Sequence, residues 1–142
     1  MEYHKPVLLH QCIDLLDIKE DGIYVDVTFG GGGHSREILK HLTTGHLYGF
    51  DQDPDAKANV PDDSKFTLIS ANFRHLKKSL RLHGVKEIDG LLGDFGVSSY
   101  QIDQPERGFS TRFEGPLDMR MNPDRNLTAA HVLNQYSEGE LN

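Results

Sequence analysis

The chain has 142 residues, of which 37% are hydrophobic and 26% are charged, so it fits one soluble globular domain. No apolar run approaches the roughly 18 residues that a membrane helix requires, and "MEYHKPVLLH" lacks a signal-peptide pattern, so we expect a cytoplasmic protein without a membrane partner. The net charge of −7 argues against a protein that holds nucleic acid chiefly through phosphates, because such proteins usually present a basic surface.

The first predicted element is a helix over residues 7–16, where apolar residues recur at helical spacing. Cys12 lies on its apolar face, so a buried structural thiol is favoured over a catalytic one. As the only cysteine, it excludes an internal disulfide and a cysteine zinc site. The eight histidines are scattered without clustering, so no metal site is predicted.

After a turn at 19–22, strand patterns alternate with helix patterns. Strands are expected at 23–28, 45–51, 65–70 and 88–96, and helices at 35–42 and 73–84. Ser35 is the expected N-cap of the first of these helices. The acidic, two-proline segment that follows Asp51 allows only a short helix. This alternation predicts a parallel, doubly wound α/β sheet with strand order 3-2-1-4.

From residue 96 to about 126 the sequence is polar and rich in glycine and proline, and we interpret this stretch as an active-site loop. A helix over 127–136 follows, with Thr128 or Asn126 as its cap. Ser137 and Glu140 have the spacing of a capping box, which predicts the start of a further helix just where the sequence stops.

Strand four would lie at the edge of the predicted sheet, although it is apolar enough to be covered on both sides. This feature and the final capping box suggest an N-terminal portion of a longer protein. An exposed edge would also allow self-association.

The turn after the first strand contains four glycines, in "YVDVTFGGGGHSREIL". It lies where the strand order reverses, which is where open α/β sheets bind ligands. Missing Cβ atoms let a ligand approach the main chain closely. The alternative is a tight turn that packs the helix on the sheet, but four glycines exceed what that requires. Ser35 holds the place of the third glycine of a G-x-G-x-x-G fingerprint, which disfavours a pyrophosphate site.

Acidic residues lie at or near the ends of three of the predicted strands. Asp51 ends the second strand about 20 residues after the first glycine, the position from which a carboxylate reaches ribose hydroxyls in enzymes that use NAD or S-adenosylmethionine. Asp26 and Asp94 would repel a pyrophosphate and attract a sulfonium and an α-amino group, which favours the methyl donor. Asp26 could instead only accept backbone hydrogen bonds near the turn.

Five stretches together resemble one family, the bacterial 16S rRNA cytosine-N4 methyltransferases called MraW or RsmH. They are "HKPVLL", "GIYVDVTFGGGGHS", "FDQDP", "GDFGVSSYQIDQPERGFS" and "GPLDMRM", and the resemblance covers essentially the whole sequence. Tyr100 stands where the family usually has proline. The resemblance implies a Rossmann-like class I methyltransferase sheet, parallel and doubly wound, with about four of the usual seven strands. Residues 1–142 would be the donor-binding part of one domain, without the family's helical insertion and C-terminal strands.

The family's activity is methyl transfer from S-adenosylmethionine to the exocyclic N4 amine of a cytidine, with 16S rRNA or the small ribosomal subunit as partner. Carried over position by position, its donor-binding residues are Gly32, Gly33, His34, Asp51, Phe73, Asp94 and Gln101. Asp94 is also the candidate catalytic residue, as an acceptor close to the amine, with the backbone carbonyls of residues 94–97 as the alternative acceptors. Phe95 is either a stacking surface for the base or a core residue.

In the polar loop, arginines alternate with phenylalanines, a mixture that suits contact with unpaired RNA, where bases stack and arginines meet phosphates. They are Arg107, Phe109, Arg112, Phe113, Arg120 and Arg125, of which Arg107, Phe109 and Arg120 are the candidate substrate contacts. Acidic neighbours make an internally salt-bridged lid an equal alternative, and only the family resemblance favours substrate contact. Two other functions stay open: a nicotinamide-dependent oxidoreductase, and an incomplete, catalytically inactive fragment that binds the donor.

Overall fold

The computed structural model describes residues 6–142, and the chain divides into two compact units, one ending at Phe95 and one beginning at Gly96. The first unit contains α1 (Leu9–Leu16), β1 (Ile23–Asp26), α2 (Gly33–His41), β2 (His46–Asp51), the 3-10 helix η1 (Pro54–Asn59), β3 (Phe66–Ser70), η2 (Phe73–His75), α3 (Leu76–Leu82) and β4 (Gly90–Leu92). The second contains α4 (Ser99–Asp103), η3 (Pro105–Arg107), α5 (Ala129–Gln135) and α6 (Glu138–Leu141). Within residues 6–142, no helix is long and apolar enough to cross a membrane.

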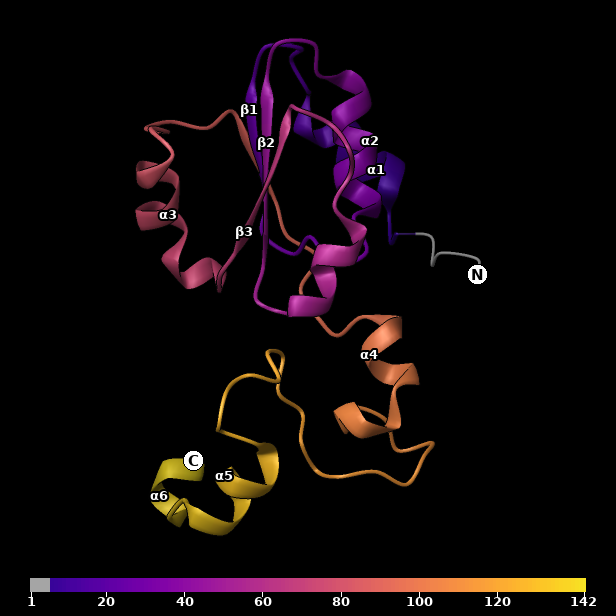
Figure 1. The fold of residues 1–142 in the computed structure, drawn as a ribbon, viewed down its shortest axis with the longest axis vertical. Helices are drawn as coiled ribbons and strands as arrows, with labels where there is room; N and C mark the ends of the chain where they lie inside the picture. The colour runs from indigo at the N-terminus through magenta and orange to yellow at the C-terminus, as the bar shows by residue number, and fades with distance from the viewer. Residues whose placement is uncertain (1–5) are drawn as a thin grey trace. The chain divides into compact units, whose positions relative to one another are not determined.

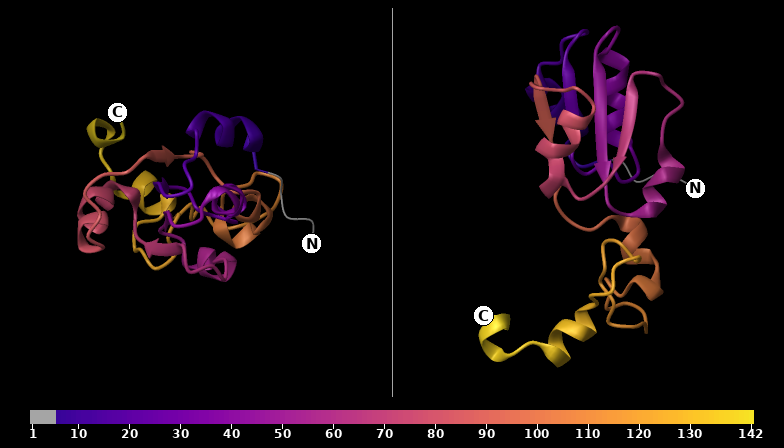
Figure 2. Two further views of the ribbon diagram at one scale, coloured as in Figure 1. Left: turned by 90° about the horizontal axis from the view of Figure 1, so that it is seen from above. Right: turned by 60° about the vertical axis from the view of Figure 1, so that its left-hand side comes forward.

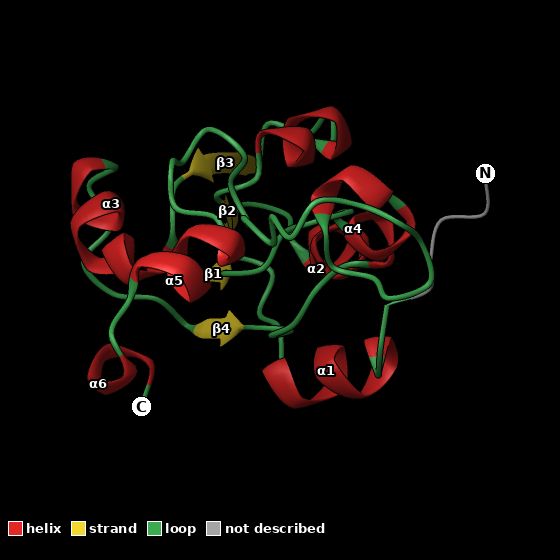
Figure 3. Ribbon diagram, turned by 90° about the horizontal axis from the view of Figure 1, so that it is seen from below, coloured by secondary structure: helices red, strands yellow, loops and turns green. Residues whose placement is uncertain are grey.

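The four strands form one parallel sheet in the order β3-β2-β1-β4, as the sequence predicts. Val25 in the centre of β1 pairs with Tyr48 of β2 on one side and with Leu91 of β4 on the other. Figure 2 shows the strands running alongside one another, and Figure 3 shows the same order end-on. The strand order reverses at β1, so the carboxyl end of β1 is the expected ligand-binding position of such a sheet.

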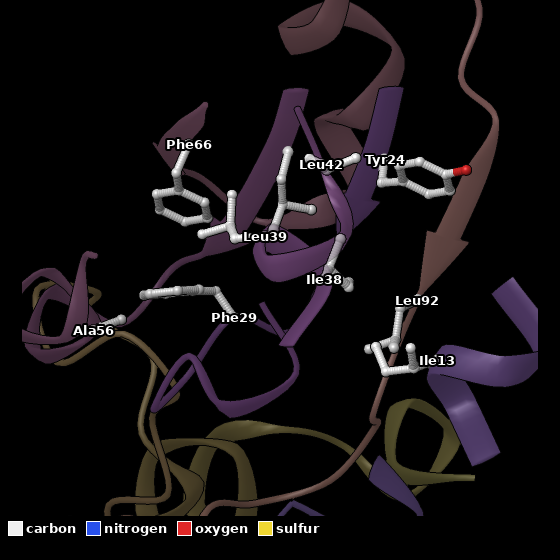
Figure 4. Packing of buried hydrophobic residues seen from close by; sticks show 10 residues of the cluster. Ile13, Tyr24, Phe29, Ile38, Leu39, Leu42, Ala56, Phe66 and Leu92 are labelled. Atoms are coloured by element: carbon white, nitrogen blue, oxygen red, sulfur yellow. The ribbon is translucent and has the colours of Figure 1, made fainter. Parts of the chain in front are cut away.

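Helices cover both faces of this sheet, which confirms the doubly wound arrangement. α1 and α2 lie against one face and α3 lies against the other (Figures 1 and 3). Alternate strand residues supply the two cores: Tyr24 packs among side chains from the α1 and α2 side, while Val25 packs with Leu80 of α3. Figure 4 shows the first of these cores.

Cys12 is half-buried and packs against this first core, beside the buried Ile13. The predicted helix is confirmed, although it begins at Leu9 rather than at residue 7. Leu9, Cys12, Ile13 and Leu16 provide the contact of this helix with the core, whereas Leu8 and Leu15, whose spacing also predicted the helix, are exposed.

The predicted boundaries of three elements in the first unit are wrong. α2 begins at Gly33, with Gly32 as its N-cap, so Ser35 lies inside the helix and does not cap it. The hydroxyl of Ser35 instead donates to Asp26 at 2.7 Å. β4 ends at Leu92, so Asp94 lies two residues beyond the strand. The predicted helix over 73–84 is a 3-10 turn followed by the shorter α3.

The polar stretch at 96–126 contains α4 and η3, which the sequence analysis missed. The first turn of α4 is closed by a capping box between Ser98 and Gln101. Thr128 is the cap of α5, since its hydroxyl accepts the N–H of His131. The predicted box at the end of the sequence is confirmed, because the N–H of Ser137 donates to Glu140 at 2.8 Å.

Candidate functional site

Side chains from three elements hold the main chain of the glycine turn. The N–H of Gly30 donates to Asp51 Oδ2 at 2.8 Å, and the carbonyl of Gly30 accepts Asn59 Nδ2 at 3.0 Å. The guanidinium of Arg36 donates to the carbonyl of Gly31 at 2.6 Å. The turn is therefore fixed to the end of β2, to η1 and to α2.

The backbone conformation and the packing of this turn already require glycine at two of its positions. Gly32 has a φ of 73°, a left-handed backbone conformation that residues other than glycine rarely adopt. A Cβ on Gly33 would lie 2.2 Å from Cγ of Pro6. Their number is thus not by itself evidence for a ligand, contrary to the argument from sequence. What favours a ligand is that Gly32, the N-cap of α2, has no side chain to bond the first-turn N–H groups.

Asp51 lies at the carboxyl end of β2 and joins the two turns that flank this position. Its Oδ2 accepts the N–H of Gly30, and its Oδ1 accepts the N–H of Asp53 at 2.9 Å. Burial raises the pKa of the Asp51 carboxyl, and these main-chain hydrogen bonds lower it in part. Each carboxylate oxygen has two acceptor positions, so this bonding still leaves Asp51 able to accept hydroxyl donors.

Asp26 is buried at the end of β1, with 1% of its surface exposed. Its Oδ1 accepts the N–H of Thr28 at 3.0 Å, and its Oδ2 accepts the hydroxyl of Ser35. Burial raises the pKa of this carboxyl, and the bond from Ser35 is the largest opposing cause. These contacts confirm that Asp26 accepts hydrogen bonds near the turn, and its attraction for a positively charged donor stays a prediction.

Asp94 is exposed, and its main chain is held to the end of β1 through Thr28. The N–H of Asp94 donates to Thr28 Oγ1 at 2.7 Å, and this oxygen lies 3.4 Å from Asp26 Oδ1. Thr28 is thus a positioning residue that the sequence analysis missed. The Asp-x-Thr spacing was its available signal, since an aspartate commonly accepts the N–H two residues later.

Phe73 and Phe95 form an exposed aromatic pair in the segments that follow β3 and β4. Their ring centroids are 5.6 Å apart at an interplanar angle of 60°, and the side chains are 42% and 70% exposed. Phe95 is therefore no core residue. Two exposed rings in edge contact offer an apolar surface to a planar group.

His34, in the first turn of α2, is buried, and its Nε2 lies 3.1 Å from the carbonyl of Val7. Nε2 is the donor here, because a carbonyl can only accept. The imidazole thus ties the start of α2 to the segment before α1.

In the second unit, Gln101 is buried and serves as the third helical residue of the α4 capping box. Its side-chain oxygen accepts the N–H of Ser98 at 3.0 Å, and its own N–H donates to Ser98 Oγ at 3.1 Å. The predicted donor contact of Gln101 stays a prediction.

Arg107 and Arg120, both predicted to contact RNA, bond to the main chain of the second unit. The buried guanidinium of Arg107 donates to the carbonyls of Arg120 and Met121, at 3.1 and 3.2 Å, and lies 6.0 Å from the ring centroid of Phe109. Arg120 binds Asp118 through both carboxylate oxygens, the shortest contact being 2.7 Å. These contacts favour the internally salt-bridged alternative, and the substrate roles of all three residues stay predictions.

Fold and site together define an α/β protein that presents a glycine turn, an uncapped helix and the Asp51 carboxylate at the strand-order reversal, the arrangement of nucleoside-binding sheets. The model of the MraW methylase family matches residues 1–142, and the chain belongs to that family. The four parallel strands are accordingly part of a Rossmann-like methyltransferase sheet.

Two similar proteins are both named ribosomal RNA small subunit methyltransferase H, from Christiangramia forsetii and Flavobacterium johnsoniae. Each is 62% identical over 142 residues, which is 99% of this chain and 47% of the relative. The chain therefore spans about half the length of these curated relatives. The solved structure of an rRNA methylase from Streptococcus thermophilus matches 57% of this chain and 51% of that chain, with 22% identity and a TM-score of 0.44.

Proposed function

We propose that this chain binds S-adenosylmethionine at the carboxyl ends of its strands and serves methyl transfer to the exocyclic N4 amine of a cytidine in 16S rRNA. The observation that carries this proposal is the match of the family over all 142 residues. The names of the relatives support small-subunit rRNA, free or assembled, as the partner. A ribosomal substrate would also place the protein in the cytoplasm.

The residues at this edge of the sheet fit such a donor. We assign the ribose hydroxyls to Asp51, whose oxygens keep acceptor positions. We assign the methionine portion to Gly32, Gly33 and the main chain of His34, because the first-turn N–H groups of α2 favour a carboxylate. Phe73 provides an exposed ring for the planar base.

When bound, the donor supplies a methyl group that its sulfonium already activates. The lone pair of the cytosine N4 is delocalised into the ring, so the protein's task is to hold this nitrogen in line with the methyl group. We assign Asp94 as the acceptor that bonds the amine and takes the proton it loses. The bond from the N–H of Asp94 to Thr28 fixes the main chain from which this carboxylate extends.

We further propose that residues 1–142 are the donor-binding part of a single methyltransferase domain, because the chain covers 47% of its relatives. The alternative is a chain that binds the donor without catalysing transfer. Incubation with the donor and small ribosomal subunits, followed by mass spectrometry of the rRNA nucleosides, separates the two. N4-methylcytidine formed by the chain alone would exclude the inactive alternative.

Calorimetric titration with S-adenosylmethionine and with NAD tests the donor assignment. We expect saturable binding of S-adenosylmethionine only, and at least roughly tenfold weaker binding in Asp51→Ala, because hydrogen bonds to a charged group contribute about 1.5–3 kcal/mol. Asp89→Ala is the matched control, since Asp89 also accepts a main-chain N–H, that of Ile23 at 2.8 Å, but at the start of β1. Equal affinities in the two variants would contradict the role of Asp51, and selective binding of NAD would favour the oxidoreductase.

A further inference from the structure

Positive charge is concentrated on α3 and the turns that flank it. Residues 74–86 hold five of the chain's 15 Lys and Arg residues and none of its 22 Asp and Glu residues. All five side chains are exposed, namely Arg74, Lys77, Lys78, Arg81 and Lys86. The charge of this surface is positive, whereas the net charge of the chain is −7, so the surface attracts anions locally.

Four of these cations form one stripe along the helix. Arg74, Lys77, Lys78 and Arg81, hereafter the basic stripe, are separated by three or four residues, the spacing that brings side chains together on a helix surface. Leu80, between them in sequence, is buried in the core under the sheet. The helix thus turns Leu76 and Leu80 toward the sheet and the basic stripe toward solvent, and Leu82 at its end is also exposed.

Electrostatic repulsion within the basic stripe lowers the stability of the isolated protein. Cations spaced by three or four residues repel one another, and the first turn of α3 carries no acidic residue to favour its positive end. Within residues 6–142, no carboxylate forms an ion pair with the stripe, and Arg74 Nε instead donates to His75 Nε2 at 3.0 Å. Elsewhere Lys40 and Lys65 do have carboxylate partners. A bound polyanion would offset this repulsion.

The stripe begins beside the candidate site. η2 follows β3 directly and starts with Phe73, so the first cation of the stripe is adjacent in sequence to a proposed donor contact. From there α3 runs back along the sheet, on the face opposite α1 and α2 (Figure 1). A polymer with one unit in the site and a charge on every unit could therefore follow the helix.

We propose that the basic stripe binds the phosphodiester backbone of single-stranded RNA next to the nucleotide that enters the site. The identity of the polymer as RNA rests on the proposed function, whereas the polyanion surface rests on the stripe itself. Single-stranded RNA is held by grooves or surfaces of positive charge with aromatic rings nearby, and Phe95, which is exposed beside Phe73, supplies such a ring. A membrane surface fits less well, because Leu76 and Leu80 pack in the core and Leu82 is the one exposed leucine of α3, which is too little apolar surface to insert.

The test compares two triple variants that change the net charge equally. Lys77→Gln/Lys78→Gln/Arg81→Gln neutralises the stripe, and Lys19→Gln/Lys40→Gln/Lys57→Gln neutralises three exposed lysines elsewhere in the same unit. Fluorescence anisotropy measures the affinity of each chain for a short labelled single-stranded RNA over a range of salt concentrations. Calorimetry with S-adenosylmethionine runs on the same samples.

The stripe variant should bind RNA roughly 10- to 100-fold more weakly at about 0.1 M salt, and its salt slope should fall by about 2, because each lost phosphate contact removes about 0.7. The control should lose much less. Equal losses in both variants, or no RNA binding by the unaltered chain, would overturn the proposal, as would stripe-dependent binding to phosphatidylserine vesicles without a change for RNA. Failure to bind S-adenosylmethionine would count against the proposed function alone.

Circular dichroism and urea unfolding check that the stripe variant folds. Removing repulsion between neighbouring cations should leave its stability unchanged or raise it. If the triple variant nevertheless fails to fold, the pair Lys78→Gln/Arg81→Gln gives the same comparison against Lys40→Gln/Lys57→Gln, with a proportionally smaller loss of RNA affinity.

Discussion

The turn after β1 and helix α3 belong to the same unit, yet their charged side chains have different partners. In the turn, Asp26, Arg36 and Asp51 all bond to the main chain or to a buried hydroxyl. Along α3, Lys77, Lys78 and Arg81 face solvent. A tight turn leaves main-chain groups without helix or strand partners, and nearby side chains satisfy them. α3 satisfies its own main chain, which leaves its side chains available for a partner.

The same difference separates the arginines of the second unit. Arg107 and Arg120 bond to main-chain carbonyls within an irregular segment, whereas Arg112 and Arg125 have exposed side chains. If RNA does contact this unit, the exposed arginines are better placed to meet it than the two that the sequence analysis selected. Whether a charged side chain is available to a ligand therefore depends more on whether nearby main-chain groups need it as a hydrogen-bond partner than on its residue type.

The largest effect on stability is expected from a substitution that removes the hydrogen bonds at the turn after β1. Asp26→Ala leaves the hydroxyl of Ser35 and the N–H of Thr28 without their acceptor, and we expect the free energy of unfolding to fall by about 2–4 kcal/mol. Asp94→Ala, which removes an exposed carboxylate, should change it by less than about 0.5 kcal/mol. Urea unfolding followed by circular dichroism measures both. Similar changes in the free energy of unfolding for the two variants would contradict the view that Asp26 serves the fold while Asp94 is available to a ligand.

A smaller effect is expected in the second unit. Arg120→Ala removes the bidentate pair with Asp118 and the bond to the carbonyl of Pro123, and we expect it to loosen the segment that these contacts hold. Arg112→Ala should be nearly neutral. Hydrogen exchange of the amides over 118–125 should accelerate in the first variant only. Should Arg120→Ala exchange like the unaltered chain, its contacts would not stabilise this segment.

The smallest effect concerns pH. Because burial raises the pKa of the Asp51 carboxyl above its usual 3.8, the group takes up a proton at a higher pH in the folded chain than in the unfolded one. A protonated carboxyl loses acceptor capacity, so donor affinity should decline as pH falls through this raised pKa. Calorimetry at a series of pH values measures the decline. Asp51→Asn should bind weakly at every pH, and an identical pH profile in that variant would assign the titration to another group.

The sheet could be predicted from the sequence because strand and helix patterns alternate along the whole first unit. Alternating apolar strands and amphipathic helices specify the order of elements and the carboxyl edge where Asp51 lies, and small errors at each boundary do not change that result. The family motifs likewise extend along the whole sequence.

The details of the site depend on single hydrogen bonds, and a one-dimensional pattern leaves these undecided. Ser35 has the residue type of an N-cap, but the buried carboxylate of Asp26 takes its hydroxyl and the helix begins earlier. The S-x-x-Q spacing at Ser98 signals a capping box as clearly as the spacing at Ser137, yet the polar surroundings of Ser98 suggested an irregular loop. The burial of Arg107 has no local signal, because its partners lie 13 and 14 residues away.

The most direct test of the central claim is a titration of the ¹⁵N-labelled chain with S-adenosylmethionine, followed by the amide resonances. The account predicts saturable shifts at Gly32, Gly33, His34, Asp51, Phe73 and Asp94, and no shifts at Lys77, Lys78 and Arg81. Shifts confined to other residues, or none at saturating donor, would contradict a donor site at the carboxyl ends of these strands.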